Sequence, residues 1–276
     1  MEERPLPTFE EASRIMRTGI EPLGTEKVDL FQLLRRVIAE DVVSDSNIPI
    51  LDNSAMDGYA VIAEDTGHAA ADKPATLTIT GEIQAGDDPE GYNLEPGQAI
   101  RIMTGAPVPR GADAVVEFEK TSEEGSQVHI YASFKSGDNL RRAGEDIASG
   151  DTVIQKGTML LPAHMGLLAS VGRQQALVYK KPRVAIITTG NEIAEPGQPL
   201  KRGWVRNSNA YTLYGLVQQY GGIPEYLGIA ADTPEATATM LTRALEHDLV
   251  ITNGGVSMGR YEFVKDVRKD LGIDVR

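Results

Sequence analysis

The run "RVAIITTG", residues 183–190, constrains the fold of this chain more than any other part of the sequence. It is nearly all apolar and rich in β-branched residues, which is typical of a parallel strand covered on both faces. A helical pattern follows, and then a strand in "PEYLGIAAD", a helix beginning in "TPEATATM" and a third apolar strand in "DLVITNGG". This alternation predicts an α/β layer with right-handed crossovers. The first helix is expected to bury the face formed by Leu213, Leu216, Val217 and Tyr220.

The part of the chain that precedes this layer has a β-type pattern. From about Pro74, the runs "ATLTITGEI", "QAIRIMT", "DAVVEFEK" and "QVHIYAS" are separated by turn-forming residues, which predicts a β-rich module. Three short helices are also expected: one opens with the capping box "TFEE" at residue 8, one starts in "DLFQLL" at Asp29, and one covers "PAHMGLLASVG". A length of 276 residues fits about two domains.

Composition excludes several classes of function. Lys and Arg number 27 against 40 Asp and Glu, and the net charge of -13 argues against nucleic acid or an anionic membrane as a partner. The absence of cysteine removes disulfides, thiolate nucleophiles and thiolate metal sites. No apolar run approaches the ~18 residues of a membrane span, and we expect a cytoplasmic protein. The histidines are scattered and are expected to be surface or packing residues: His68, His129, His164 and His247.

Polar signatures follow all three strands of the α/β layer: "TTGNE", "AAD" and "TNGGVSMG". Ligands of open α/β sheets bind beyond the carboxyl ends of the strands. Gly254 and Gly255 would let the backbone approach a phosphate closely, although a glycine turn that only reverses the chain is the commoner use of such a string. Glu192 and Asp232 offer oxygen ligands for Mg²⁺. Helix capping is the alternative for both residues, and for Asp232 it is the one that we favour on this residue alone.

Five motifs in the same order carry a resemblance to a known family. They are "DNSAMDGYA" at 52–60, "RIMTGAPVPRGADAVV" at 101–116, "NLRRAGEDI" at 139–147, "GNE" after the first strand and "NGGVSMG" at 253–259. Together they resemble the molybdopterin molybdenumtransferases of the MoeA and gephyrin E-domain type, over essentially the whole chain. Without the other four motifs, "DNSAMD" would be interpreted as an Asx-type turn.

The resemblance implies a multidomain α/β plus β-rich fold. A molybdopterin-binding three-layer α/β/α domain is expected in 1–24 and 180–276, an inserted β-barrel-like domain in 52–146, and a small mixed connecting and dimerisation domain in 25–51 and 147–179. The family would continue beyond "DLGIDVR" with a further strand, a molybdate-contacting segment and a C-terminal β domain. We expect either a fragment or a short form that lacks part of the site.

The implied reaction is Mg²⁺-dependent cleavage of adenylylated molybdopterin, with release of AMP and insertion of molybdate, the second substrate, into the dithiolene. The resemblance also implies a homodimer with a shared site, and a molybdopterin adenylyltransferase and apo-molybdoenzymes as partners. Two alternatives stay open: adenylylation of molybdopterin, and a non-catalytic dimeric scaffold or pterin-binding fragment.

The residues that match functional positions of the family fall into three groups. The catalytic group is Asp57, Asp146, Glu192, Asp232 and Glu262. The substrate-binding group is Thr104, Arg141, Gly190, Asn253, Gly254, Gly255 and Ser257. The Mg²⁺ ligands are Asp57, Glu192 and Asp232. Arg141 would neutralise phosphate charge, whereas Arg142 beside it would equally serve as an ion-pair partner of the acidic surface.

Three residues depart from the family pattern. Glu262 stands where the family usually has an aspartate, Arg260 replaces a usual glutamate, and Asn191 stands where many members have an acidic residue. The longer Glu262 side chain would displace its carboxylate by about one bond length, which matters in a site sensitive to misplacement on the order of 1 Å.

Overall fold

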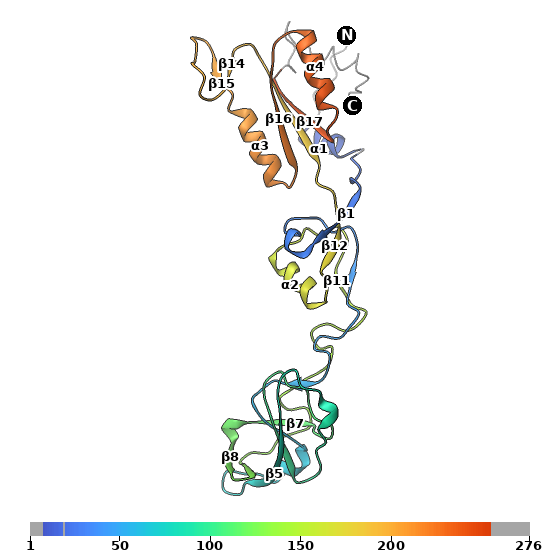
Figure 1. Cartoon of the computed structure of the whole chain (residues 1–276), viewed down its shortest axis with the longest axis vertical. Coiled ribbons are helices and arrows are strands. Elements are labelled where there is room, and N and C mark those ends of the chain that lie inside the picture. The colour runs from blue at the N-terminus through green and yellow to red at the C-terminus, as the bar shows by residue number, and fades with distance from the viewer. Residues whose placement is uncertain (1–7, 19, 255–276) are drawn as a thin grey trace. The chain divides into compact units, whose positions relative to one another are not determined.

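The computed structural model describes residues 8–18 and 20–254 of the chain (Figure 1). These residues form two compact units. One unit contains the described parts of 1–40 and 175–276 together with 157–161, and the other contains 41–156 and 162–174. The residues of the expected connecting domain are thus divided between the two units, and the boundaries of the three domains stay a prediction.

The unit of residues 41–156 and 162–174, all of which the structure describes, is built on a six-stranded sheet with the order β7-β4-β6-β5-β9-β8. Neighbouring strands are antiparallel except β5 and β6, which are parallel. Apolar clusters form on both faces, with Tyr59 and Val61 in one and Ala60 and Val115 in the other. The strands are β4 (Gly58–Val61), β5 (Ala75–Ile83), β6 (Gln98–Ile102), β7 (Ala114–Glu117), β8 (Thr121–Glu124) and β9 (Gln127–Ile130).

The four strands predicted for this module are confirmed as β5, β6, β7 and β9, whereas β4 and β8 were not predicted. All four residues of β4 are buried, because both of its faces are covered, so it shows no polar alternation. β8 is the polar edge strand "TSEE", which pairs with β9. Its sequence resembles a turn, and only pairing with a neighbour makes it a strand. The 3₁₀ turns of this unit are η2 (Ala63–Thr66), η3 (Pro89–Gly91) and η4 (Phe118–Lys120).

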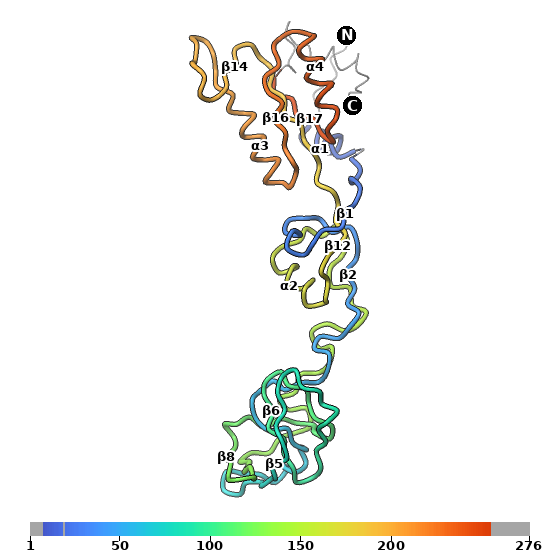
Figure 2. Tube along the Cα trace, in the orientation of Figure 1, coloured from blue at the N-terminus to red at the C-terminus, as the bar shows by residue number. Residues whose placement is uncertain are grey.

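Two segments of the same unit that are far apart in sequence lie side by side (Figure 2). β2 (Val42–Val43) pairs with β11 (Thr152–Ile154), and Ile48 forms an isolated bridge with Ile147. β3 (Asn53–Ser54) pairs with β10 (Leu140–Arg141). The predicted helix "PAHMGLLASVG" is confirmed as α2 (Pro162–Ser170).

The other unit contains the predicted α/β layer. Within residues 175–254 its main sheet has three parallel strands, with β13 (Arg183–Thr189) between β16 (Ile223–Ala230) and β17 (Leu249–Asn253). Ala185 and Ile187 of β13 pack against α4 (Pro234–Ala244). α3 (Asn209–Gln219) lies on the opposite face, so the layers are α/β/α as expected (Figure 1). β14 (Ile193–Ala194) pairs with β15 (Val205–Arg206) beyond the end of β13.

The buried face of α3 differs from the expected one. Ala210 is buried and Leu213 and Val217 are half-buried, whereas Leu216 is 41% exposed and Tyr220 is 82% exposed. Residues 210, 213 and 217 form one stripe of the helix, and 216 and 220 lie beside it. The helical spacing of the apolar residues was predicted correctly, but the face that is buried lies beside the predicted face.

The remaining elements of this unit include one confirmed and one corrected prediction. Thr8 caps α1 (Phe9–Arg17) in the predicted capping box: its side chain accepts from the Glu11 N–H, and its own N–H donates to the Glu11 carboxylate at 2.9 Å. "DLFQLL" does not start an α-helix. It forms the 3₁₀ turn η1 (Leu30–Gln32) directly after β1 (Thr25–Asp29), because β1 is held in a strand pair with β12 (Gln175–Tyr179).

Candidate functional site

The strand β3, inside "DNSAMDGYA", brings three of the five motifs together. On one side it pairs with β10, with Arg141 opposite Asn53. On the other side the Ser54 carbonyl accepts from the Gly105 N–H at 2.8 Å, and the Ser54 N–H donates to the Ala106 carbonyl at 3.0 Å. Main-chain hydrogen bonds therefore hold the motifs "RIMTGAPVP" and "NLRRAGEDI" on either side of "DNSAMDGYA".

Asp57 and Thr104, both predicted site residues, are in direct contact. One carboxylate oxygen of Asp57 accepts from the Thr104 N–H and from the Thr104 hydroxyl, each at 2.7 Å. These hydrogen bonds, the backbone one first, lower the pKa of the Asp57 carboxyl. Asp57 is exposed, so an oriented anion faces solvent at this point.

Arg141 and Asp146 are also in contact. The Arg141 guanidinium donates through Nε to Glu145 at 2.6 Å and through Nη2 to Asp146 at 2.5 Å. These two carboxylates, Glu145 first, raise the pKa of Arg141. Glu145 was missed by the sequence reasoning, although its position within "RRAGEDI", four residues after Arg141, is the spacing of a local ion pair.

Arg142 is an ion-pair partner, as the alternative interpretation of the sequence had it. Its Nη1 lies 2.6 Å from Asp52, whose other carboxylate oxygen accepts from the Ala143 N–H at 2.8 Å. The Ala143 hydrogen bond, followed by that of Arg142, lowers the pKa of Asp52. The two aspartates of "DNSAMD" therefore have different partners. Asp52 binds Arg142 and the Ala143 N–H, whereas Asp57 accepts hydrogen bonds from Thr104.

In the α/β unit, glycines follow the carboxyl ends of β13 and β17. Gly190 has φ +139° and Gly254 has φ +96°. A Cβ at residue 254 would lie 2.8 Å from Oγ1 and 2.9 Å from the carbonyl oxygen of Thr189, so only glycine fits at this position. The close approach brings the ends of the two strands together, as expected from "TTGNE" and "TNGG".

Asn191 and Asp232 are joined at the same edge of the sheet. The Asn191 N–H donates to Asp232 at 3.0 Å, and the Asp232 N–H donates to the Asn191 side chain at 3.2 Å. Asp232 is not the cap of α4: Thr233 caps it by accepting from the Ala236 N–H at 3.2 Å. The capping interpretation of Asp232 was wrong because the proline at residue 234 sets the helix start one residue later.

The carboxylate of Glu192 lies against Gly190. A Cβ at residue 190 would lie 2.9 Å and 3.0 Å from the two Glu192 oxygens. Among the described residues no hydrogen-bond donor contacts this carboxylate, so its oxygens are accessible to a ligand. Asn253 is close to the same edge and accepts from the Asn209 side chain at 3.2 Å. The predicted residues Gly255, Ser257 and Glu262, and the departure Arg260, lie outside the described residues.

Beside this edge is a network that the sequence reasoning missed. Glu195 accepts from the hydroxyl of Tyr226, from that of Tyr211 at 3.1 Å, and from the buried Asn207 side chain at 3.2 Å. Burial, and then Glu195, raise the pKa of Tyr226. A cavity of about 240 Å³ next to it is lined by Ala210, Tyr211, Tyr214 and Tyr226. The polar run "RNSNAY" was the available signal.

The predicted site residues therefore form two groups, each within one unit. Asp57, Thr104, Arg141 and Asp146 belong to the β-rich unit, and Gly190, Glu192, Asp232, Asn253 and Gly254 to the α/β unit. In residues 8–18 and 20–254 no three His, Cys, Asp or Glu side chains gather as a metal site would require. Over the same residues, no helix is long and apolar enough to cross a membrane.

The fold and the two groups define a class: a multidomain α/β and β-rich protein with carboxylates and glycine turns at the carboxyl edge of its parallel sheet. Residues 7–172 match the family described as MoeA N-terminal region (domain I and II). Residues 185–275 match the probable molybdopterin binding domain. The chain belongs to the MoeA family, as the five motifs predicted.

Relatives and solved structures agree with this assignment. The molybdopterin molybdenumtransferase of Nostoc sp. is 38% identical over a match of 276 positions that covers 98% of this chain and 63% of that protein. The one of Bacillus subtilis is 40% identical over 256 residues, covering 91% and 59%. The molybdopterin biosynthesis MoeA protein of Pyrococcus horikoshii OT3 superposes with a TM-score of 0.84 at 35% identity, covering 89% of this chain and 65% of that one. The chain thus spans less than two thirds of each relative.

Proposed function

We propose that this chain takes part in molybdenum cofactor biosynthesis by cleaving adenylylated molybdopterin, with release of AMP and transfer of molybdate to the dithiolene. The observation that carries the proposal is the pairing of Asp57 with Thr104 at the point where three motifs meet. An exposed carboxylate held by two hydrogen bonds is a positioned, deprotonated group. It suits orientation of water or a cation at a phosphoanhydride better than donation of a proton.

Arg141 would neutralise the phosphate charge of the substrate. Its guanidinium now contacts Glu145 and Asp146, which fix its orientation. A phosphate would exchange with one of these carboxylates as the partner of the guanidinium, and the other would keep Arg141 in place. Glu145 and Asp146 are therefore proposed as the residues that position Arg141.

Glu192 and Asp232 would hold Mg²⁺. The fit rests on their chemistry: both are oxygen donors at the same edge of the sheet, and Glu192 accepts no hydrogen bond from the described residues. Mg²⁺ is commonly held by one or two carboxylates, with waters and substrate phosphates completing its shell. When bound, the ion would supply charge neutralisation for the substrate phosphates.

We propose a cytoplasmic homodimer whose site combines Asp57 of one subunit with Glu192 and Asp232 of the other. This arrangement would unite the two residue groups that belong to different units of one chain. It is supported by the family assignment. The three-domain organisation and the partner proteins expected from the sequence belong to the same proposal.

The test measures AMP released from adenylylated molybdopterin by the purified chain with Mg²⁺, with and without molybdate. Molybdate-dependent release is expected, and Asp57→Ala should abolish it while circular dichroism stays unchanged. Asp72→Ala, at another exposed aspartate of the same unit, is the matched control and should keep full activity. Full activity of Asp57→Ala would remove this residue from the mechanism.

Other outcomes would point to the alternatives. Tight pterin binding without AMP release would indicate a binding fragment or scaffold, and transfer of AMP from ATP would indicate an adenylyltransferase. The shared site is tested by mixing Asp57→Ala and Glu192→Ala chains. Partial recovery of activity is expected, because one of the two sites in each mixed dimer is intact, and no recovery in verified heterodimers would contradict sharing.

A further inference from the structure

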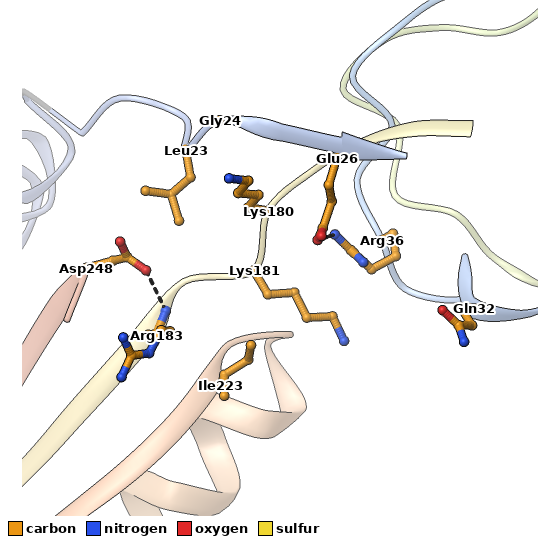
Figure 3. A pocket seen from close by; sticks show the side chains of 10 residues that line it. All are labelled: Leu23, Gly24, Glu26, Gln32, Arg36, Lys180, Lys181, Arg183, Ile223 and Asp248. Carbon is orange, nitrogen blue, oxygen red and sulfur yellow. Dashed lines mark hydrogen bonds and ion pairs between the residues drawn. The ribbon is translucent and has the colours of Figure 1, made fainter. Parts of the chain in front are cut away.

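A pocket of about 630 Å³ lies at the amino ends of the parallel strands (Figure 3). Arg183 begins β13 and Asp248 directly precedes β17, so this edge is the one opposite to Gly190 and Asp232. The other wall comes from the β1 region, with Glu26 and Arg36. The pocket is therefore separate from the proposed site.

The lining of this pocket is basic in a chain whose net charge is -13. Its cations are Arg36, Lys180, Lys181 and Arg183, and its carboxylates are Glu26 and Asp248. Both carboxylates already have partners. Glu26 accepts from Arg36 at 2.5 Å, and Asp248 accepts from the Arg183 backbone N–H at 2.7 Å.

Among the described residues, the two lysine ammonium groups have no ion-pair partner. In the part of the chain that the structure describes, neither Lys180 nor Lys181 lies within 4.0 Å of a carboxylate oxygen. Both residues are exposed and both line the pocket. In an acidic protein, adjacent lysines without carboxylate partners leave a local surplus of positive charge.

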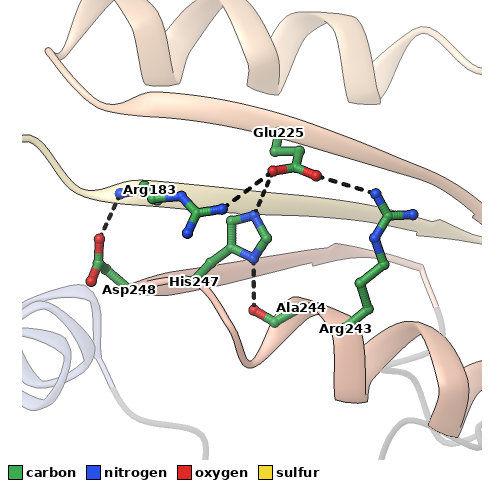
Figure 4. A network of polar contacts seen from close by, with 6 residues as sticks. All are labelled: Arg183, Glu225, Arg243, Ala244, His247 and Asp248. Atoms are coloured by element: carbon green, nitrogen blue, oxygen red, sulfur yellow. Dashed lines mark hydrogen bonds and ion pairs between the residues drawn. The ribbon is translucent and has the colours of Figure 1, made fainter.

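The guanidinium of Arg183 is only partly neutralised. Its Nη2 lies 3.6 Å from Glu225, and the same carboxylate accepts from Arg243 at 3.2 Å and contacts Nε2 of His247 at 2.9 Å (Figure 4). The His247 side chain is only 3% exposed, so this network is fixed at the edge of the sheet. One carboxylate shared by two guanidinium groups leaves positive charge on Arg183 to attract a further anion.

We propose that this pocket binds a small polyanion that carries two or more phosphate or carboxylate groups. A volume of about 630 Å³ is that of a small-molecule site. The three available cations, Lys180, Lys181 and Arg183, extend from different positions of the lining and match several anionic groups better than one. The acidic surface of the rest of the chain would repel a long polyanion such as nucleic acid. The inference does not depend on the proposed function.

The test is calorimetric titration of the whole chain with inorganic pyrophosphate, without Mg²⁺ and at low ionic strength. One pyrophosphate per chain is expected, bound more tightly than orthophosphate and more weakly as salt is added. The Lys180→Gln/Lys181→Gln double variant should lose about tenfold or more in affinity, because two direct charge contacts are removed. Lys180→Arg/Lys181→Arg should keep most of it.

Lys201→Gln is the matched control, since this lysine belongs to the same unit, stacks on Trp204 and is not part of the pocket. The Lys201→Gln variant should bind pyrophosphate with the same affinity as the unmodified chain. Binding that is equal in the double variant, or that is abolished by Arg141→Gln, would place the anion elsewhere and overturn the proposal. Absence of any binding by the unmodified chain would overturn it as well.

Discussion

Gly58→Ala should destabilise the β-rich unit, because the backbone of β7 leaves no room for a methyl group beside β4. A Cβ at residue 58 would lie 1.8 Å from the carbonyl oxygen of Val116, 2.8 Å from its carbonyl carbon and 3.0 Å from the Cα of Glu117. All three are main-chain atoms, so no side-chain rotation relieves the overlap. β4 would have to move by roughly 1.5 Å to approach the ~3.5 Å separation of non-bonded atoms.

The magnitude follows from two effects. Overpacking a close contact costs about 1–3 kcal/mol. Moving β4 also weakens main-chain hydrogen bonds next to it, such as that of the Phe118 N–H to the Asp57 carbonyl at 3.1 Å. With about 1 kcal/mol for this weakened bond, the total loss of stability is about 2–4 kcal/mol. Since Asp57 directly precedes Gly58, the same shift should also disturb its contact with Thr104.

Amide hydrogen exchange of β4 and β7 is the suitable assay, because it reports the opening of the β-rich unit separately from that of the α/β unit. Gly91→Ala is the control, since a Cβ there has no heavy atom within 4 Å. Its change in opening free energy should stay within about 0.5 kcal/mol. If Gly58→Ala leaves β4 and β7 as protected as Gly91→Ala does, the steric reasoning is wrong.

Three further predictions concern the α/β unit. Thr233→Ala should lower the free energy of unfolding in urea by about 1 kcal/mol, because α4 loses its N-cap; an unchanged value would contradict the assigned cap. Leu241→Ala should cost about 3 kcal/mol in the same assay, since this side chain is 5% exposed in the core under α4; a loss below about 1 kcal/mol would mean that the site is not packed. The hydrogen bond from His247 lowers the pKa of Glu225 in the folded protein. The stabilisation by Glu225 should therefore be present above the pKa of this residue in the unfolded chain, near 4.5, and be lost as pH falls through the lower pKa of the folded state. Glu225→Gln should therefore unfold more easily than the unmodified chain at pH 7 and differ less from it in acid; an equal difference at both pH values would refute this linkage.

Much of the fold follows from local sequence patterns. β13 was predictable because a buried parallel strand is apolar along its whole length, and α1 and α4 because capping and proline signals act over a few residues. β8 was not predictable, since "TSEE" is polar and becomes a strand only by pairing with β9. The buried face of α3 differs from the predicted one because apolar residues occupy a wider part of the helix surface than the part that the sheet covers.

The sequence by itself determined the family, the residue types of the site and the edge of the sheet where Glu192 and Asp232 lie. The family and the residue types follow from the order of the motifs along the chain. The edge of the sheet follows from the direction of its parallel strands. Only the tertiary structure decided that Asp57 contacts Thr104, that Asp232 is joined to Asn191 instead of capping α4, and that Lys180 and Lys181 line a basic pocket. Each of these contacts joins segments separated by many residues, and their partners are selected by strand pairing and packing, which no short stretch of sequence specifies.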